Sequence, residues 1–592
     1  MENKPITFPN GNTALAVIPP KNVDYPEIIR ALTIQQPKAV FVVIGGAKNL
    51  DDTLKATLSS LFSNGIATTA TAIGALIVDG GTKSGVMEMM GQGVAEQERR
   101  SILLGVAPEG KVDYQSQSTD GASDSKTPLD PHHSHFVLVK GDKWGDETAT
   151  LFGVASELAR HIPVVAILAG GGEIAKKEVM QCVQRGWPVV VITGSGELAD
   201  TLAQWWRQKR VYPTVLQRIL RRKRTSPDRD IAQVVEGGDL YLFSHKASSE
   251  ELKALLKFLC LKQEKSILAQ IQERERLYAL MASQHQTTFK RLQIWILALG
   301  VLATALALGQ TQLESLGWLK VNSFPDQLYH FFVIVVPILV TILLGIVTYF
   351  KWGEKWVLLR NSREVLKREI FLYRTHTERY AEPPVAPVHP GARKSAEQKL
   401  AEKVKLLSQQ LMQTEVNMDA MTISTPPRLP RFGVADEDDG YSDLSPDDYI
   451  KFRLDDQRSY YRQRAVKWSR QLKIFQPLVI IATGIGAILA AVKVELWLPL
   501  ATALAASFAL YLEYMQVVNT LTKYNQAATS LEDVKQWWTA LPEAEKHQPE
   551  NFHKLVEATE KVLESEHSSW VQNMQRALNK LYNKDSTNDD DE

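Results

Sequence analysis

The stretch Asp79-Gly80-Gly81-Thr82-Lys83-Ser84-Gly85-Val86-Met87 follows the apolar run Ala75–Val78 and precedes a segment of helical periodicity. It therefore predicts a turn from a β-strand into an α-helix. Two consecutive glycines permit positive φ and close approach of a ligand, and the amides that open a helix are unpaired donors at its positive end. Lys83 adds a charge, and Thr82 and Ser84 add hydroxyl groups. We expect a phosphate group here, although tight turns also need glycine for packing.

Similar small-residue turns follow other apolar runs of residues 1–246. They contain Gly45-Gly46, Gly105, Gly170-Gly171-Gly172 and Gly194-Ser195-Gly196. The alternation of short apolar runs with amphipathic segments predicts a doubly wound α/β domain. Ligands bind such sheets at the carboxyl ends of the strands, so the glycine turns mark the expected ligand edge. Strands are expected near 40–44, 75–79, 102–106, 135–139, 163–168, 188–192 and 239–243.

Six motifs occur in one order over about residues 10–205, and together they resemble the nucleotide-sensing SLOG superfamily. The closest branch is the one shared by prokaryotic proteins and the cytosolic amino-terminal region of melastatin-type TRP channels. The resemblance implies a Rossmann-like sheet that binds a nucleotide or a nucleotide-derived messenger, with ADP-ribose-like compounds among the candidates. The motifs are IGGA (44–47), DGGTKSGVM (79–87), LGVAPEGKV (104–112), HSHFVLVKG (133–141) with WGDE (144–147), AGGGEIAKKE (169–178) and ITGSGELAD (192–200).

These motifs give the expected ligand-binding residues. The phosphate cradle consists of Gly80, Gly81, Thr82, Lys83 and Ser84, and the rest of the edge consists of Gly45, Gly46, Gly170, Gly171, Gly194 and Ser195. Two carboxylates, Glu147 and Glu173, are candidates for contacts with the ribose or base. By resemblance Glu147 belongs to the family pattern, where it either accepts from a ribose hydroxyl or caps a helix.

Glu173 is also the candidate for catalysis. Some SLOG relatives hydrolyse the N-glycosidic bond of a nucleoside phosphate with a glutamate that lies a few residues beyond a Gly-Gly turn. Here the turn lacks the Gly-Thr pair before the more distal Glu178. We therefore favour binding without turnover, and we keep hydrolysis by Glu173 as the alternative.

Composition narrows the other classes of site. The 592 residues contain 68 Lys and Arg against 67 Asp and Glu, which gives no charge signal for nucleic acid. Two cysteines, Cys182 and Cys260, favour neither a disulfide framework nor a metal cluster. The segment Pro131–His135 matches no zinc spacing, so we expect no metal and an imidazole in contact with the ligand. We see no apolar core of a signal peptide at the start.

Four uncharged or nearly uncharged apolar runs come in two pairs: 292–309 with 331–350, and 474–492 with 496–514. Each is close to the ~20 residues that cross a bilayer core, although buried helices of a large soluble domain are the alternative. Basic residues flank the first pair and precede the second. The positive-inside rule therefore places both hairpin tips on the outer side of the membrane and both termini in the cytoplasm. The chain is thus expected to be a multi-pass protein of the bacterial inner membrane. The spans contain no ionisable pair, which disfavours a proton-coupled transporter.

The expected order is a ligand domain (1–246), a connecting helix (247–291), a first membrane module (292–380), a Pro-rich and acidic linker (381–447), a second module with cytoplasmic helices (448–583) and an acidic tail (584–592). An uninterrupted helix is expected from Ser249 to Arg291. The loop 112–129 is either a lid or a flexible insertion. The stretch 207–229 carries nine basic residues and is either a solvated helix or a contact with anionic lipid.

Both hairpins, with Tyr524–Ala528 and Trp537-Trp538, resemble the SLATT type of two-helix membrane module, which often accompanies SLOG sensors in bacterial defence-type systems. The predicted fold is a Rossmann-like cytosolic domain followed by an all-α membrane region of four transmembrane helices. The predicted function is a nucleotide sensor coupled to an oligomeric membrane effector or pore, with the lipid bilayer, the nucleotide and further copies of the chain as partners. The alternatives are a membrane-anchored nucleotide hydrolase and a non-conducting scaffold.

Overall fold

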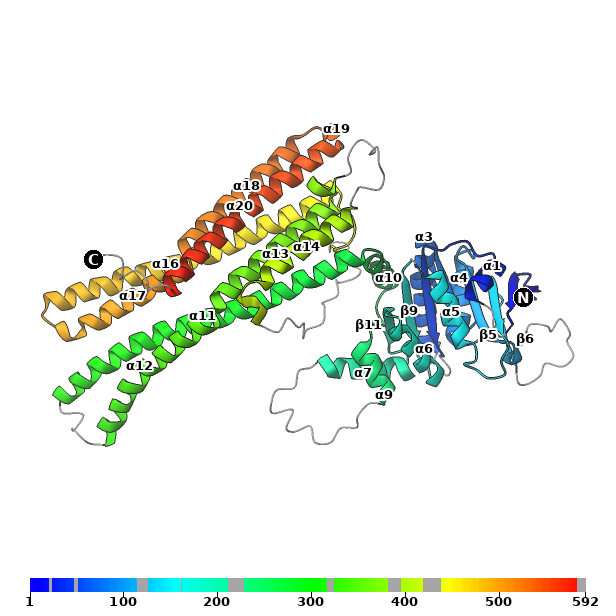
Figure 1. Ribbon diagram of the computed structural model, residues 1–592, viewed down its shortest axis with the longest axis horizontal. Helices are drawn as coiled ribbons and strands as arrows, with labels where there is room; N and C mark the ends of the chain where they lie inside the picture. Colours follow the sequence, from blue (N-terminus) through cyan, green and yellow to red (C-terminus); the bar gives the residue numbers. More distant parts are fainter. Residues whose placement is uncertain are drawn as a thin grey trace. The chain divides into compact units, whose positions relative to one another are not determined.

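The computed structural model describes residues 1–20, 24–46, 52–113, 126–160, 162–210, 228–316, 324–381, 395–418 and 438–582 (Figure 1). They form two compact units. The sheet unit comprises Met1–Ser266 and Thr425–Tyr441. The helical unit comprises Ile267–Ser424 and Ser442–Glu592.

Among the described residues of the sheet unit, nine strands form one sheet. Every neighbouring pair is parallel except β1 and β2, which are antiparallel. The inner strands are continuous apolar runs, as expected where a parallel sheet is covered on both faces. In spatial order the strands are β1 (Glu2–Thr7), β2 (Thr13–Ile18), β8 (His135–Val139), β5 (Leu103–Pro108), β4 (Ala75–Asp79), β3 (Ala39–Gly45), β9 (Val164–Ala169), β10 (Val189–Thr193) and β11 (Leu240–Ser244).

Helices cover both faces of this sheet. Val40, Val42 and Ile44 of β3 share a core with α1, α5, α6, α7 and α9. Phe41 and Val43 alternate with them and face the other layer, which contains α3, α4, α10 and the π-helix η1. The helices are α1 (Tyr25–Ala31), α2 (Asp52–Ser60), η1 (Leu61–Ala67), α3 (Thr68–Ile73), α4 (Gly85–Glu96), α5 (Thr148–Leu158), α6 (Glu173–Gln184), α7 (Glu197–Arg210), α9 (Arg229–Gly237) and α10 (Ser249–Glu264).

The strand order places the topological switch point beside β3. From β3 the chain builds β4, β5 and β8 on one side, and it then returns to place β9, β10 and β11 on the other. The carboxyl ends of β3 and β9 therefore lie next to each other, with Gly45 opposite Ala169. This is where ligands bind in open α/β sheets.

The predicted α/β fold is confirmed, but one predicted helix is wrong. The segment expected as a single helix from Ser249 to Arg291 is broken, because α10 ends at Glu264 and α11 begins at Ser266. Lys265 between them leaves the helical region with φ −96° and ψ 52°. No glycine or proline marks the position. The break coincides with the boundary between the two units.

Several sequence-based predictions lie wholly or partly outside the described residues. They concern the centre of the 112–129 loop, the basic stretch beyond Arg210, much of the 381–447 linker and the 584–592 tail. Within the linker range, the structure describes helix α14 (Ala396–Met412), which begins with a capping box at Ser395.

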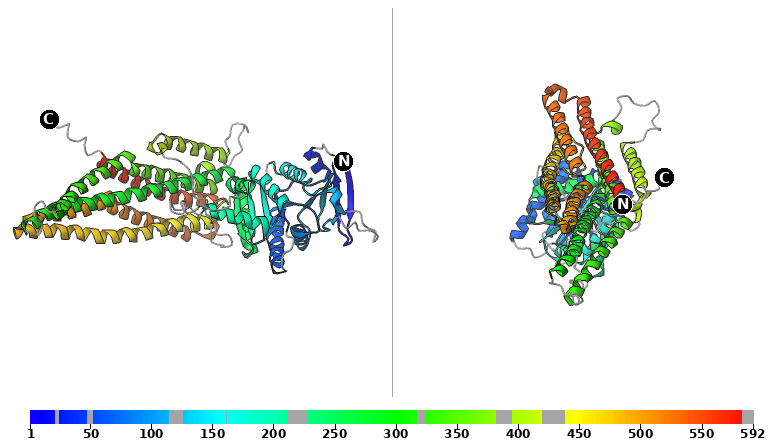
Figure 2. Two further views of the ribbon diagram at one scale, coloured as in Figure 1. Left: turned by 90° about the horizontal axis from the view of Figure 1, so that it is seen from below. Right: turned by 90° about the vertical axis from the view of Figure 1, so that its left-hand side faces the viewer.

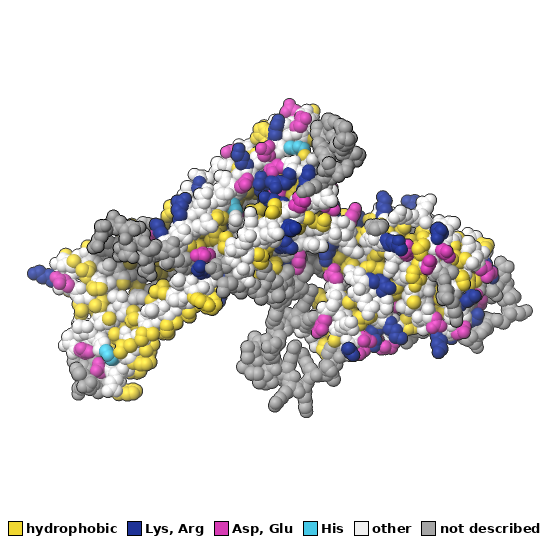
Figure 3. All heavy atoms as spheres, viewed as in Figure 1, with side chains coloured by type: hydrophobic (Ala, Val, Ile, Leu, Met, Phe, Trp, Pro, Cys, Tyr) yellow, Lys and Arg dark blue, Asp and Glu magenta, His cyan; other side chains and the backbone are white. Residues whose placement is uncertain are grey.

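In the described part of the helical unit, four helices are long and apolar enough to cross a membrane. They pair as two hairpins, which continue into polar helices (Figures 1 and 2). Only 6 to 11% of each apolar window is buried, and Phe331 and Ile480 are 56% and 64% exposed. Hydrophobic side chains cover the visible face of the hairpin formed by α11 and α12, as lipid contact requires (Figure 3). The helices are α11 (Ser266–Ser315), α12 (Phe324–Phe350), α13 (Trp352–Arg374), α15 (Pro446–Tyr449), α16 (Asp456–Ala491), α17 (Leu498–Tyr514), α18 (Val517–Ala540), α19 (Glu543–Lys546) and α20 (Pro549–Tyr582).

The two hairpins share one backbone feature at the end of their second apolar helix. Each second apolar helix is joined to a polar helix through a non-glycine residue in the left-handed region. Lys351 has φ 49° between α12 and α13, and Gln516 has φ 51° between α17 and α18. The architectural repeat expected from the sequence thus extends to the backbone conformation of its joints.

Candidate functional site

The switch point of the sheet is lined by backbone atoms. A Cβ atom at Gly45 would lie 2.0 Å from the carbonyl oxygen of Ala169, so only glycine fits where β3 and β9 end side by side. A Cβ atom at Gly46 would lie 3.8 Å from the Cα of Gly171. Gly170 and Gly171 adopt φ of 64° and 95°, which favour glycine. The structure thus brings four predicted residues together in one narrow rim, which we call the glycine rim: Gly45, Gly46, Gly170 and Gly171.

Helix α6 begins at the glycine rim with its first turn open. Its N-cap, Gly172, is exposed and supplies no side chain to the helix amides. Such amides at the positive end of a helix bind phosphate and carboxylate groups. Glu197 also faces this rim, since its Oε2 lies 3.9 Å from the Cβ position of Gly46. Its φ of 45° is a costly conformation of the kind that clusters at functional sites.

The loop after β10 is closed by the protein's own groups. The amides of Gly194 and Gly196 donate to the carboxylate of Asp200 at 2.5 and 3.1 Å. The hydroxyl of Ser195 accepts from the Gly170 amide at 2.8 Å and donates to the carbonyl of Ile192. Gly194 and Ser195, both predicted ligand residues, therefore use these groups to hold the loop in shape.

The predicted phosphate cradle is half covered. The amide of Gly81 donates to Asp79 Oδ1 at 2.7 Å, and the amide of Lys83 donates to the Pro128 carbonyl at 2.9 Å. Gly81 and Thr82 are buried, and Thr82 forms a β-bridge with Leu129. That segment follows a short ladder of β6 (Val112–Asp113) and β7 (Thr127–Pro128). Of the five predicted residues, Lys83 is exposed and Gly80 and Ser84 are half-buried.

A buried histidine holds the turn that follows β4. His133 lies between two carboxylates, with Nε2 2.8 Å from Asp79 Oδ1 and Nδ1 3.1 Å from Asp130 Oδ1. Burial alone would lower the pKa of His133, but the two carboxylates outweigh it and raise the pKa to about 9. The ring stacks on Phe136 and is fully buried. The prediction that an imidazole contacts the ligand is therefore wrong for His133, which instead joins the Asp79 loop to the segment around Asp130.

Two carboxyl groups interact between the start of α5 and α6: Glu147, the N-cap residue of α5, and Glu178 of α6. Glu147 is buried and accepts from the Gly145 amide at 2.8 Å, so its side chain does not cap α5. Burial raises the pKa of Glu147. Burial, and then the charge of Glu147, raise the pKa of Glu178 to about 8. Sequence reasoning noted Glu178 but did not assign it to the site, because its proximity to Glu147 depends on the packing of two helices.

Glu173 lies in a different environment. Its side chain is 82% exposed and forms an ion pair with Lys176 at 2.8 Å, and Lys176 also pairs with Asp228 at 2.8 Å. A general acid needs a setting that raises its pKa, usually burial. The structure provides that setting for Glu178 and not for Glu173. Within the described residues, no cluster of three or more His, Cys, Asp or Glu side chains is placed to hold a metal ion.

Comparison with known families assigns three parts of the chain. Residues 38–250 match the model described as SLOG in TRPM, prokaryote. Residues 449–570 match the SMODS and SLOG-associating 2TM effector domain 1, and residues 274–386 match a family described as a protein of unknown function, DUF4231. The first hairpin, which resembled a SLATT module by arrangement, thus matches DUF4231, while the second matches SLATT.

Similar curated proteins are cation channels of the transient receptor potential subfamily M. The mouse member 2 is 28% identical over 222 residues, the member-like 2 protein of Nematostella vectensis 30% over 210 residues and the human member 7 29% over 217 residues. These alignments cover 31%, 30% and 31% of this chain but only 14%, 13% and 12% of the channels. The likeness therefore concerns the sheet unit and a small part of each relative.

Proposed function

From a chain that joins a SLOG domain of the prokaryotic, TRPM-related type to a DUF4231 region and a SLATT two-helix effector domain, we propose a membrane signalling protein controlled by a nucleotide-derived ligand. SLOG domains in general bind nucleotide-derived ligands. The observation that carries the proposal is the glycine rim with the uncapped first turn of α6 beside it. Backbone donors at a helix start suit a phosphate group.

In this proposal each part of the site has its own role. The phosphates lie against Gly46 and the first turn of α6, with Lys83 of the half-open loop as a nearby cation. The carboxyl groups of Glu147 and Glu178 contact the ribose or the base. Gly194 and Ser195 act indirectly, because they hold the loop that supports Gly170.

The effector is a multi-pass membrane protein with four candidate spans. We propose that it lies in a bacterial inner membrane with both termini in the cytoplasm, and that an oligomer of it forms a pore in stress or antiviral signalling. The basic flanks of the spans support this orientation. The ligand biases the pore only through differential affinity, and about tenfold tighter binding to the open state supplies about 1.4 kcal/mol.

The binding test uses two glycine-to-glutamate variants of the full chain. At Gly172 a Cβ atom meets nothing within 4 Å, so Gly172→Glu adds a carboxylate at the start of α6 without a clash. Gly237→Glu is the matched control, at an exposed position in the last turn of α9. We expect ADP-ribose or ADP to raise the Tm of the wild type and of Gly237→Glu, but not that of Gly172→Glu. Equal shifts in all three proteins would reject the site.

Conduction needs a separate test, because a non-conducting scaffold would also bind the ligand. We expect liposomes that contain the protein to release ions when the ligand is added on the side of the sheet unit. Ligand binding without ion release would support the proposed sensor and reject the proposed pore.

One observation favours hydrolysis as a second candidate. Burial and the charge of Glu147 raise the pKa of Glu178 to about 8, and a carboxyl group that stays protonated at pH 7 can act as the general acid in the cleavage of a glycosidic bond. This replaces Glu173 as the catalytic candidate. Release of free base from a nucleoside monophosphate, lost in Glu178→Gln and kept in Glu173→Gln, would establish it.

A further inference from the structure

A second polar cavity lies inside the helical unit, in the polar bundle beyond the hairpins. It has a volume of about 600 Å³ and is lined by residues of α11, α13, α14, α16, α18 and α20. Eight of the described lining residues are Lys or Arg, and six are Asp or Glu. Both membrane modules contribute, since α11 and α13 belong to the first and α16, α18 and α20 to the second.

The carboxylates of this cavity already have partners. Glu560 accepts two hydrogen bonds from Arg453, both at 2.8 Å, and a third from the hydroxyl of Tyr449. Glu566 accepts from the hydroxyl of Tyr461 at 2.9 Å. Glu364 and Glu564 pair with Arg363 and Arg368. Glu560, Glu364 and Glu564 are therefore paired with other cations. The carboxylate of Glu566 attracts Arg360, and its Oε1 has no hydrogen-bond partner among the described residues. The remaining cations outnumber it.

Three of those cations are held by aromatic rings instead. The guanidinium carbon of Arg360 lies 3.9 Å from the ring centre of Trp570, and that of Arg464 lies 5.4 Å from Tyr460. The ammonium of Lys290 lies 5.6 Å from Trp356 and 5.8 Å from Trp468. In the described part of the chain, none of the three cations forms an ion pair with a carboxylate.

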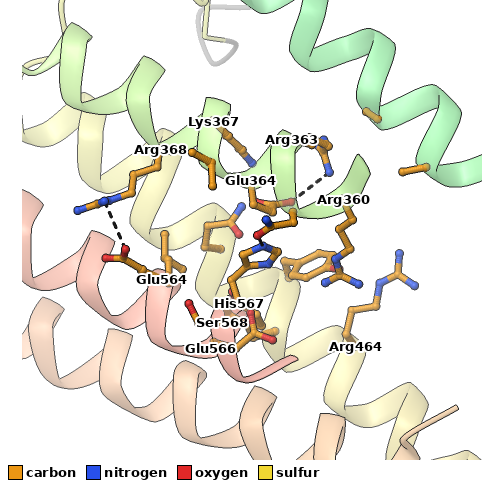
Figure 4. A pocket seen from close by; sticks show the side chains of 18 of the residues that line it. Arg360, Arg363, Glu364, Lys367, Arg368, Arg464, Glu564, Glu566, His567 and Ser568 are labelled. Carbon is orange, nitrogen blue, oxygen red and sulfur yellow. Dashed lines mark hydrogen bonds and ion pairs between the residues drawn. The ribbon is translucent and has the colours of Figure 1, made fainter. Parts of the chain in front are cut away.

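An aromatic face fixes a cation in place but leaves its N–H groups available. Arg360 donates one of them to the hydroxyl of Tyr524 at 3.3 Å. Figure 4 shows Arg360 and Arg464 entering the same part of the cavity from α13 and α16. Burial, and then the charges of Arg360 and Arg464 among others, lower the pKa of the neighbouring Lys290, and Glu566 is one carboxylate beside three cations. An anion between the cations would relieve the remaining repulsion.

Three buried polar atoms of lining residues have no hydrogen-bond partner among the described residues: the donors Arg453 Nη1 and Arg368 Nε, and the acceptor Glu566 Oε1. The side chain of Arg453 is 3% exposed, and its Nη1 has no hydrogen-bond partner among the described residues. The side chain of His567 donates from Nε2 to Asn361 Oδ1 at 2.9 Å. Burial, and then the charge of Arg360, lower the pKa of His567 to about 4, so this imidazole is neutral at pH 7. A buried donor without a protein partner can be satisfied by an acceptor atom of a ligand, an ion or a water molecule.

We propose that this cavity is a second ligand site, which binds a multiply charged phosphate group between Lys290, Arg360 and Arg464. A bound anion would join α11 and α13 of the first module to α16 of the second, and would thereby control how firmly the polar ends of the hairpins are held together. Arginine and lysine on rigid supports are the usual ligands of phosphate. The site does not depend on the glycine rim.

Two sources can supply this phosphate chemistry. Lys290 lies two residues before the apolar run that begins at Leu292, within reach of the headgroup layer. Arg360 and Arg464 lie ten residues from the apolar runs at Phe350 and Ile474, which is about 15 Å along a helix. An anionic lipid headgroup and a soluble phosphate compound are therefore the two candidate ligands of the site.

The test uses the full chain in nanodiscs of neutral phosphatidylcholine, with sodium pyrophosphate as the probe and sodium chloride of equal ionic strength as the reference. We expect pyrophosphate to raise the Tm of the wild type and to bind at least tenfold more weakly to Arg464→Gln. The control is Arg462→Gln, on the same helix but outside this cavity, where the side chain is 59% exposed and pairs with Glu532. Equal affinities of the two variants would overturn the proposal.

Three further arms separate this site from its alternatives. Lys290→Met removes the ammonium group and keeps the apolar stem against the indole rings. If Arg464→Gln does not fold, the loss of pyrophosphate binding must be found in Lys290→Met. Gly172→Glu must keep the pyrophosphate response, whereas a response lost only in Gly172→Glu would place the anion at the glycine rim and overturn the proposal. If a lipid is the natural ligand, nanodiscs with phosphatidylglycerol raise the Tm of the wild type but not of Arg464→Gln, and pyrophosphate adds nothing.

Discussion

The two proposed ligand sites of this chain differ in the groups that they offer to an anion. The glycine rim offers backbone amides, and its shape depends on residues that lack a side chain, such as Gly45. The cavity of the helical unit offers guanidinium and ammonium groups on aromatic supports, such as Arg360 on Trp570. The donors of a backbone site cannot be removed by mutation, so such a site is disrupted by added volume or by an added negative charge. A side-chain site loses its donors when a single lysine or arginine is replaced.

The largest effect on stability is expected from the buried ion pair of Arg453 and Glu560 at the cavity. Glu560→Ala leaves the guanidinium of Arg453 buried without its carboxylate, and we expect a loss of about 3 to 5 kcal/mol in the free energy of unfolding of the helical unit. Glu564→Ala, one turn further along α20, removes a carboxylate that is 55% exposed and 3.5 Å from Arg368, and should cost less than about 1 kcal/mol. Denaturant titration in detergent compares the two, and similar losses would show that burial does not set the cost.

A smaller loss is expected at the glycine rim. Gly45→Ala forces a methyl group against the Ala169 carbonyl, and we expect the sheet unit to lose about 3 kcal/mol. Gly172→Ala, where a Cβ atom has open space, should change the stability by less than about 1 kcal/mol. Hydrogen exchange of the β3 and β9 amides measures both effects. An unchanged exchange rate in Gly45→Ala would mean that the two strands accommodate the methyl group at little cost in free energy.

The pH dependence of the sheet unit gives a third measurement. The pKa of His133 is raised from 6.5 to about 9 in the folded protein, so its contribution is fully present below pH 6.5 and is lost as the pH rises through 9. We expect the free energy of unfolding to fall by about 2 kcal/mol between pH 7 and pH 9. His133→Gln should be less stable at pH 7 and should lack this fall, and an equal slope in the variant would assign it to other groups.

The smallest effect is expected from a charge at the edge of the rim. Lys83 is exposed, so Lys83→Gln removes an attraction that solvent screens to about 1 kcal/mol. We expect roughly fivefold weaker binding of ADP-ribose by calorimetry, and an unchanged Tm without ligand. A loss as large as that expected for pyrophosphate in Arg464→Gln would contradict the assignment of the rim to backbone donors.

The sequence predicted the sheet unit well because its signals are local. The runs that became β3, β4 and β9 are continuous and apolar, and the glycine turns follow them directly. It could not predict how the turns are satisfied. Asp200 closes the Gly194 loop from the next helix, and His133 meets Asp79 across 54 residues of chain. Both pairings depend on the tertiary fold.

The cavity was harder still to foresee. Lys290 and Trp468 are far apart in the sequence, and each lies in a segment that resembles an ordinary charged amphipathic helix. Their meeting requires the two membrane modules to pack together. The break at Lys265 had no sequence signal either, since helix propensity and apolar period continue through it.

The left-handed residues Lys351 and Gln516 have a mechanical consequence. Without such a joint, the 51 residues from Phe324 to Arg374 would form one rod of about 77 Å. With it, one pair of backbone dihedrals at each module sets the tilt of the polar helix against the apolar one. The left-handed conformation costs about 1 to 2 kcal/mol at a non-glycine residue. Leaving it would therefore offset part of the free energy that a change in the tilt of the polar helix requires. A rotation about the φ and ψ of such a joint would break no hydrogen bond within either helix, so these two residues are suited to act as hinges.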